Sequence, residues 1–335
     1  MAPLLDVRDL TTQFFTQKGA FAAVDKVSFK VNAGETMALV GESGCGKSVT
    51  AASILRLVPD PPGRITGGEI IFEGKDLLSL SMREMRKVRG GRIGMIFQEP
   101  MTSLNPVFTI GDQITESLRE HRTISRADAE RRAIELLDLV RIPDARRQIH
   151  NYPHRLSGGM RQRAMIAMAL ACDPVLLIAD EPTTALDVTT QAQILELLDE
   201  LKRRLGMAIL LITHDLGVVA EYAQSVLVMY AGRGVEAAKV EDLFRQPMHP
   251  YTRGLLAALP HPDDKVDSEG RPLPLNEISG MVPALDAMPA GCRFEPRCSY
   301  AVPACKTADV RLEVLAGGLR SAACLRAAEI DQDQS

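Results

Sequence analysis

Continuous apolar runs recur along the chain, and each is short enough to form one strand. Three of them, at residues 37–40, 175–179 and 207–212, contain no polar side chain. A run of this kind fits a strand that is covered on both faces of a parallel sheet. Alternating polar and apolar positions at 4–13 and 24–31 predict two further strands, each with one exposed face.

Helical patterns lie between the predicted strands. Residues 49–57 have helical spacing directly after the first apolar run, and 69–72 and 92–97 predict further strands. From 99 to 156 the pattern is mostly helical, and the residues from Ser125 to Asp128 resemble a helix start. One helical face after that start is formed by Ala129, Ala133, Leu136, Leu137 and Val140. We therefore predict an α/β core with an inserted helical subdomain at about 99–158.

A glycine-rich segment connects the first apolar run to the helix that follows it. Glycines let the backbone turn tightly, so that successive N–H groups and the helix N-terminus can surround phosphate oxygens. A strand, a loop and a helix in this order are the context that a phosphate-binding loop requires. We expect Lys47 to hold the β- and γ-phosphates and Ser48 to offer its hydroxyl to Mg²⁺; a plain glycine-rich turn is the alternative. The candidate nucleotide-binding residues here are Gly41, Ser43, Gly44, Cys45, Gly46, Lys47, Ser48 and Val49.

Ser157, Gly158 and Gly159 precede a predicted helix that extends to Ala171. Ser157 can cap this helix, and the two glycines leave N–H groups exposed at its positive end. A second anion site is therefore available, although helix capping alone would explain the same residues.

Two adjacent carboxylates follow the second apolar run. Asp180 and Glu181 stand at the C-terminal end of a predicted parallel strand, where open α/β sheets bind their ligands. Hard cations prefer carboxylate oxygen, so we expect Asp180 to hold Mg²⁺, directly or through water. Glu181 is then available to orient or deprotonate a water molecule. The alternative is a pair of solvated acids at a strand end.

A histidine follows the third apolar run. A helix predicted at about 189–205 ends at Gly206, and the strand after it leads into Thr213, His214 and Asp215. A lone histidine at a strand end is usually a structural hydrogen-bonding group. His214 nevertheless occupies the position expected of a γ-phosphate sensor in such a sheet.

Length and composition limit the class of protein. A chain of 335 residues exceeds the usual size of one domain, so we expect a large domain at 1–259 and a smaller one at 260–330. A net charge of −4 gives no reason to expect a nucleic acid partner. The N-terminus lacks the pattern of a secretory signal, and no apolar run approaches the roughly 20 residues that span a bilayer. We expect a cytoplasmic protein whose six cysteines are not a disulfide framework.

Six of these motifs, taken in order, resemble those of a known family. They are the loop 41–48, Gln98, residues 156–159, residues 180–181, residues 185–187 and His214. They resemble the Walker A, Q-loop, signature, Walker B, D-loop and H-loop motifs of ABC ATPases. Longer stretches at 97–106, 152–160 and 249–256 resemble the ATP-binding subunits of bacterial oligopeptide/dipeptide ABC importers. Met160 replaces the Gln of the general signature, as is common in the peptide group.

The resemblance implies a catalytic role for Glu181, with Gln98 and His214, in ATP hydrolysis. It implies that Ser48, Gln98 and, through water, Asp180 hold Mg²⁺. These five residues would therefore act together in the hydrolysis of one ATP molecule.

The resemblance also implies further contacts with nucleotide. We place Phe14, Phe15 and Phe21 in the connection between the first two strands, and the resemblance favours Phe14 as the aromatic that stacks on adenine. In ABC ATPases two such domains meet head to tail. Ser157 and Gly159 would contact the nucleotide bound mainly by the partner subunit, and Gly158 and Asp187 are further candidate nucleotide-binding residues.

The function implied by the resemblance is ATP hydrolysis that powers the import of di- or oligopeptides. The implied partners are a second ATPase subunit, which we expect to be a paralogue, two transmembrane permease subunits and an external solute-binding protein. The chain would be peripheral at the cytoplasmic face of the bacterial inner membrane. Import of nickel, glutathione or another small solute by the same subfamily stays open. A soluble ABC ATPase acting on ribosomes or DNA is less favoured, because such proteins usually carry two tandem cores or a long coiled coil.

The last four cysteines lie beyond a proline-rich segment that begins after Leu259. Five, six and eighteen residues separate them, whereas zinc sites usually have cysteine pairs two to four residues apart. Iron–sulfur clusters accept more varied spacing, and the C-terminal extension of peptide-importer ATPases, which this segment resembles, can carry a [4Fe-4S] cluster. We predict a structural cluster at Cys292, Cys298, Cys305 and Cys324, with a zinc site or four unligated thiols as alternatives.

Overall fold

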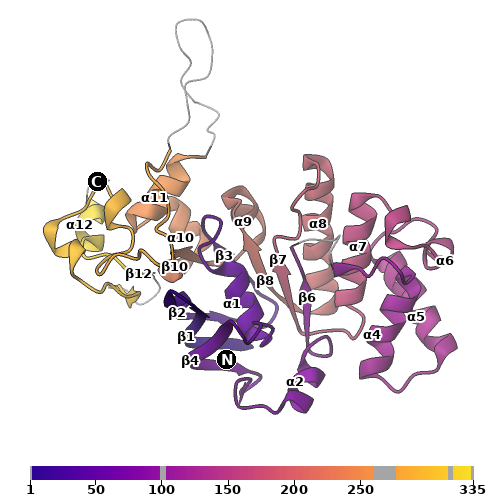
Figure 1. Ribbon diagram of the computed structural model, residues 1–335. Helices are drawn as coiled ribbons and strands as arrows, with labels where there is room; N and C mark the ends of the chain where they lie inside the picture. Colours follow the sequence, from indigo (N-terminus) through magenta and orange to yellow (C-terminus); the bar gives the residue numbers. More distant parts are fainter. Residues whose placement is uncertain (1, 99–102, 260–276, 316–319, 333–335) are drawn as a thin grey trace, which may run out of the picture. The chain divides into compact units, whose positions relative to one another are not determined.

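The computed structural model describes residues 2–98, 103–259, 277–315 and 320–332 (Figure 1). The chain forms two compact units, one of residues 1–6, 30–36 and 69–213 and the other of residues 7–29, 37–68 and 214–335. The predicted proline-rich linker falls mostly on residues 260–276, outside the described part. The division into 1–259 and 260–330 therefore stays a prediction.

Three parallel strands form the centre of the unit that contains residues 69–213. They are β6 (Ile93–Ile96), β7 (Leu176–Asp180) and β8 (Ala208–Thr213), with β7 between the other two. Every residue of β7 and β8 is buried. This is what continuous apolar runs predict for strands covered on both faces, so these strand predictions are confirmed.

The helical insertion packs within the same unit. It consists of α4 (Ile110–His121), α5 (Arg126–Leu139), α6 (Ala145–Gln148) and α7 (Gly158–Ala169), which lie side by side in Figure 1. The Ser125 hydroxyl accepts the Asp128 N–H and caps α5, and the predicted apolar face of that helix is buried. Helices therefore follow β6 as expected, while the bounds of about 99–158 stay a prediction, because residues 99–102 lie outside the described part.

Further helical elements belong to this unit. They are α2 (Met82–Val88), the 3₁₀ turn η1 (Pro153–Arg155) and α8 (Val188–Leu205). Ser81 and Glu84 form a reciprocal capping box at the start of α2. Gly206, with φ of 66°, ends α8 in the left-handed conformation that glycine adopts without strain.

A mixed sheet organises the unit that contains residues 214–335. Its strands lie in the order β11 (Glu313–Val314), β12 (Ser321–Ala322), β10 (Arg233–Lys239), β9 (Ser225–Tyr230) and β3 (Thr36–Val40). β3 and β9 are parallel, and the other neighbours are antiparallel. The C-terminal residues therefore extend the sheet that contains the strand before the phosphate loop.

A second sheet has the order β2 (Gly19–Val31), β1 (Leu5–Thr16), β4 (Gly63–Phe72) and β5 (Lys75–Asp76). Phe14 and Phe15 lie in β1 and Phe21 lies in β2. The expectation that these aromatics occupy the connection is therefore wrong. The strands are longer than predicted because the turn between them is tight: the Thr16 hydroxyl donates to the Gly19 carbonyl and accepts the Lys18 N–H, each over 3.2 Å.

The helices of this unit are mostly short. They are α1 (Lys47–Ile54), α9 (Leu216–Tyr222), α10 (Val240–Arg245), α11 (Pro250–Ala257), α12 (Ala327–Gln332) and the 3₁₀ turns η2 (Glu295–Arg297) and η3 (Pro303–Lys306). Tyr230, Tyr251 and Phe294 pack together in the core, with ring centroids 4.8, 5.1 and 5.4 Å apart. An aromatic residue of the C-terminal region is thus part of the core beside β9 and α11.

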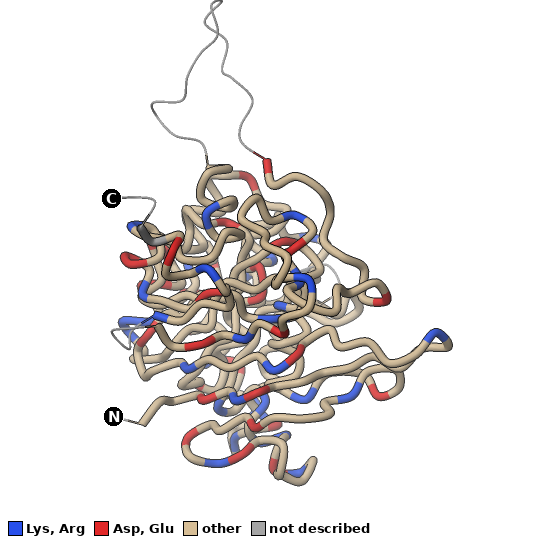
Figure 2. Tube along the Cα trace, turned by 90° about the vertical axis from the view of Figure 1, so that its left-hand side faces the viewer, with Lys and Arg blue, Asp and Glu red and all other residues tan. Residues whose placement is uncertain are grey.

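Charged residues of both signs are interspersed along the described trace (Figure 2). This agrees with the small net charge of −4. Among the described residues, none of the helices combines the length and apolar character needed to cross a bilayer.

Candidate functional site

The glycine-rich loop between β3 and α1 depends on close backbone approach. A Cβ atom at Gly41 would lie 2.2 Å from the Met229 carbonyl oxygen, and one at Gly46 would lie 2.4 Å from the Ala23 carbonyl oxygen. Gly46 also has φ of 101°, a left-handed conformation, at the residue before α1. Only glycine fits either position without moving the backbone.

Lys47 folds back over this loop. Its side chain is buried, and Nζ donates to the carbonyl oxygens of Gly41 over 2.8 Å and Glu42 over 3.1 Å. The ammonium group and the N-terminus of α1 therefore concentrate positive charge at the loop, as an anion-binding site requires.

Phe14 and His214 belong to the same unit as the loop. A Cβ atom at Gly63 would lie 3.0 Å from Cε1 of Phe14, so the half-buried Phe14 ring packs closely against this glycine. Phe15 is more exposed, with the Arg64 guanidinium 5.9 Å from its ring centroid. His214 is exposed and follows β8 in the sequence. The expected adenine contact of Phe14 and the catalytic role of His214 stay predictions.

Gln98 and Glu181 meet at the C-terminal ends of two neighbouring strands. Ile96 of β6 pairs with Ala179 of β7, and each of the two polar residues lies two positions beyond its strand partner. Nε2 of Gln98 donates to Oε2 of Glu181 over 3.2 Å. The register of the parallel pair therefore brings together two candidate catalytic residues that are 83 positions apart.

The Glu181 carboxylate is held by more than Gln98. The Thr184 hydroxyl donates to the same carboxylate oxygen over 3.1 Å, and the Glu181 N–H donates to the Ile212 carbonyl over 2.9 Å. Glu181 has φ of 45°, a strained conformation for a residue with a side chain. Asp180, directly before it, is buried at the end of β7.

The signature segment packs against the segment that contains Asp187. The Ser157 hydroxyl accepts the Met160 N–H and caps α7, as predicted. A Cβ atom at Gly159 would lie 2.9 Å from Cγ2 of Thr190, so this glycine permits the close contact. Asp187 in turn caps α8 by accepting the Thr190 N–H over 2.9 Å, and it also accepts the Thr190 hydroxyl over 2.8 Å. These two hydrogen bonds lower the pKa of the Asp187 carboxyl.

The sequence patterns did not predict a hydrogen bond between α7, the helix after Ser157, and the segment that follows Glu181. Gln162 of α7 is buried, and its Nε2 donates to the Pro182 carbonyl. Its position one turn inside a helix after a capping serine carries no distinctive signal. Thr184 was also missed as a hydrogen-bond donor to Glu181, because a threonine three residues after a carboxylate has no distinctive pattern.

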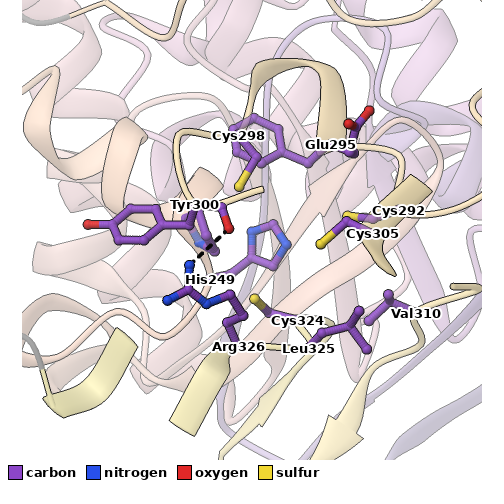
Figure 3. A pocket seen from close by; sticks show the side chains of 12 residues that line it. His249, Cys292, Glu295, Cys298, Tyr300, Cys305, Val310, Cys324, Leu325 and Arg326 are labelled. Carbon is purple, nitrogen blue, oxygen red and sulfur yellow. Dashed lines mark hydrogen bonds between the residues drawn. The ribbon is translucent and has the colours of Figure 1, made fainter. Parts of the chain in front are cut away.

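The four C-terminal cysteines line one pocket, together with His249 and Phe294 (Figure 3). The Cys292 N–H donates to the Cys305 carbonyl over 2.8 Å, and burial raises the pKa of the Cys298 thiol to about 11. The thiols are nevertheless not arranged as a metal site. Within the described ranges, no group of three or more His, Cys, Asp or Glu side chains is placed to hold a metal ion.

Comparison with known proteins decides the family. Residues 24–184 match the family model "ABC transporter", and residues 235–305 match the model "Oligopeptide/dipeptide transporter, C-terminal region". The chain belongs to the ABC transporter ATPases.

Relatives of this ATPase align over nearly all of its length. A Sinorhizobium fredii protein, named a probable peptide ABC transporter ATP-binding protein, is 56% identical over 98% of this chain and 96% of its own. An oligopeptide transport ATP-binding protein of Bacillus subtilis is 52% identical over 100% of both chains. A solved dimeric ATP-binding cassette, in a post-hydrolysis state with ADP and Pi, aligns with a TM-score of 0.64 and 28% identity over 70% of this chain and 98% of its own.

Membership of this family makes the chain an ATP-binding cassette whose ATP hydrolysis is coupled to transport. The donors expected for Mg²⁺ are the Ser48 hydroxyl, the Gln98 amide and the Asp180 carboxylate. All three are hard oxygen donors of the type that Mg²⁺ prefers. Their chemistry therefore fits the ion.

Proposed function

We propose that this ATPase powers the import of di- or oligopeptides. The match of residues 235–305 to the oligopeptide/dipeptide C-terminal model supports a peptide rather than another solute. The names of the Sinorhizobium and Bacillus relatives support the same substrate class. Peptide itself would not contact this chain, because its substrate is ATP.

Glu181 is proposed as the general base of ATP hydrolysis. The observation that carries this role is its carboxylate, which Gln98 and Thr184 hold in one orientation through hydrogen bonds of 3.2 and 3.1 Å. A carboxylate held in this way can accept a proton from an attacking water. Gln98 would join the catalytic loop to the helical insertion, and His214 would contact the γ-phosphate.

Lys47 is proposed to hold the β- and γ-phosphates of ATP, with the N–H groups of Gly41, Ser43, Gly44, Cys45, Gly46, Ser48 and Val49 around them. Ser48, Gln98 and, through water, Asp180 would hold Mg²⁺, which when bound neutralises charge on the phosphate oxygens. Phe14 would stack on the adenine ring. The buried position of Lys47 at the N-terminus of α1 supports this assignment.

A second ATPase subunit, a paralogue, is proposed to complete each nucleotide site. Ser157, Gly158, Gly159 and Asp187 would contact the nucleotide held mainly by that partner. ATP would close the pair and hydrolysis would open it, which requires that ATP bind the two states with different affinity. Two membrane permeases would use this motion and a solute-binding protein would deliver peptide. The ATPase would sit at the cytoplasmic face of the bacterial inner membrane.

We also propose a structural [4Fe-4S] cluster at Cys292, Cys298, Cys305 and Cys324. Their common pocket supports the proposal. The thiols would have to turn toward one another to bind, because their described arrangement is not that of a ligand set. No step of ATP hydrolysis requires the cluster.

Uptake by cells tests the substrate. A strain carrying Glu181→Gln in place of the native chain should lose uptake of labelled di- and tripeptides and keep uptake of nickel and glutathione. A strain carrying Glu196→Gln, an exposed position of α8, is the matched control and should import peptide normally. Normal peptide uptake with loss of nickel or glutathione uptake in the Glu181→Gln strain would favour the alternative substrates.

A further inference from the structure

We propose that Arg297 is a positioning residue for ATP binding, because it holds the phosphate loop through Glu42. The inference rests on the proposed role of residues 41–48 as that loop. It assigns to the C-terminal region an effect on nucleotide affinity that acts through Glu42.

The contact between Arg297 and Glu42 is bidentate. Nη1 donates to Oε2 of Glu42 over 2.8 Å and Nη2 donates to Oε1 over 3.1 Å. The Arg297 side chain is only 5% exposed, so little water competes for the pair. Paired parallel hydrogen bonds of this kind add geometric specificity that a single ammonium group lacks.

Arg297 is itself fixed by its surroundings. Nε donates to the Ser279 carbonyl and Nη2 to the Ile278 carbonyl, each over 3.0 Å. The guanidinium carbon also lies 5.7 Å from the ring centroid of Tyr230. The guanidinium therefore cannot reorient without losing several contacts, and it can hold Glu42 in one place.

Glu42 transmits this constraint to the ammonium group of the loop. Its N–H donates to the hydroxyl oxygen of Tyr251 over 3.0 Å, and its carbonyl accepts from Nζ of Lys47 over 3.1 Å. Side chain, N–H and carbonyl of one residue are thus all engaged. A shift of the Glu42 carboxylate would move the carbonyl that helps to place the Lys47 ammonium.

Arg293, four residues before Arg297, supports the loop from a second direction. Its guanidinium donates to the Ala231 carbonyl and to the Asp25 carboxylate. The Gly232 N–H, which follows Ala231 in the chain, donates to the carbonyl of Cys45 in the loop over 2.9 Å.

Phe294 lies between the two arginines in sequence and is buried against Tyr230 and Tyr251. The segment 293–297 therefore supports the loop at Glu42 through Arg297 and at Cys45 through Arg293 and the backbone of residues 231–232.

Arg297→Lys keeps the positive charge but cannot make the bidentate contact. We expect the Kd and KM for ATP to rise about fivefold to tenfold, which corresponds to about 1.0 to 1.4 kcal/mol. The kcat should change less than twofold, because Glu181 and its contacts are untouched. Glu42→Gln, which changes the other partner of the contact, should raise the Kd for ATP to a similar extent. The loss of binding free energy in the double variant should be smaller than the sum of the losses in the two single variants.

Arg132→Lys is the matched control. Arg132 forms ion pairs with Glu135 and Asp173 in the other unit, each over 3.0 Å, so its replacement should leave the Kd for ATP unchanged. If Arg297→Lys does not fold, the Glu42→Gln variant measures the same link, and an unchanged Kd there would overturn the inference.

Two other results would also contradict the positioning role. An unchanged Kd in Arg297→Lys, when Lys47→Ala weakens ATP binding at least tenfold, would refute the link and leave the phosphate loop assigned. A fall in kcat and thermal stability without a change in Kd would reduce Arg297 to a structural residue. An unchanged Kd in Lys47→Ala would instead refute the phosphate-loop assignment itself.

Discussion

Gln98 donates a hydrogen bond from Nε2 to Oε2 of Glu181 over 3.2 Å. The contact joins the residue at the entrance of the helical insertion to the proposed base of hydrolysis. Any movement of the insertion that displaces Gln98 would therefore alter the environment of the Glu181 carboxylate. Under the proposed function, this contact would connect movement of the membrane permeases to ATP hydrolysis.

Glu181→Gln should abolish most ATP hydrolysis and leave ATP binding intact. The amide keeps the size of the side chain but cannot accept a proton, and general-base catalysis contributes about 10²- to 10⁴-fold. Phosphate release and nucleotide binding, measured on the same preparation, check the two effects separately. Glu196→Gln should hydrolyse ATP at the native rate; native turnover by Glu181→Gln would show that Glu181 is not the base.

Lys47→Ala should weaken ATP binding at least tenfold. The substitution removes charge-assisted hydrogen bonds worth on the order of 1.5 to 3 kcal/mol each. Titration with a fluorescent ATP analogue measures the effect, and circular dichroism checks that the fold is unchanged. Lys30→Ala, at an exposed position of β2, should bind ATP with native affinity.

Asp25 should stabilise the protein in a pH-dependent manner. Burial raises the pKa of its carboxyl, but the hydrogen bond and charge of Arg233, with the charges of Arg293 and Arg311, outweigh burial and hold the pKa below its usual value. A lowered folded-state pKa means that the stabilisation is complete above the unfolded pKa of about 4 and is lost as the pH falls through the folded value.

Asp25→Asn should therefore cost about 1.5 to 3 kcal/mol at pH 7, because it removes the carboxylate that pairs with the half-buried Arg293, whereas Arg233 and Arg311 keep Asp309. The difference from the native protein should shrink as the pH falls below about 4. Urea unfolding at several pH values measures both effects. Asp286→Asn, which removes an exposed ion pair with Lys18, is the control and should cost at most about 1 kcal/mol. A difference that stays constant with pH would contradict the assignment.

Cys298→Ser should remove the proposed cluster. Protein purified without oxygen should be brown and contain about four iron and four acid-labile sulfide per chain, as a [4Fe-4S] cluster requires. The serine variant should be colourless, while Cys172→Ser, outside the pocket, should keep the colour. Colourless native protein with stoichiometric zinc would indicate a zinc site, and the absence of metal would leave four unligated thiols.

Local sequence patterns predicted much of the nucleotide-binding fold. The apolar run of β7 and the caps Ser125 and Ser157 depend on neighbours within a few residues. Their physical requirements can therefore be recognised without tertiary information. The misplacement of Phe14 and Phe15 shows the limit, since the extent of β1 depends on its pairing with other strands.

Residue type and position at the ends of strands and helices predicted which residues would bind phosphate, hold Mg²⁺ and activate water. How those residues are held depends instead on contacts between distant parts of the chain. Arg297 and Glu42 are 255 positions apart, and Gln98 and Glu181 are 83 apart. In the sequence, Arg297 resembles any charged surface residue. Its partner Glu42 is known only from the folded structure, which brings the two residues together.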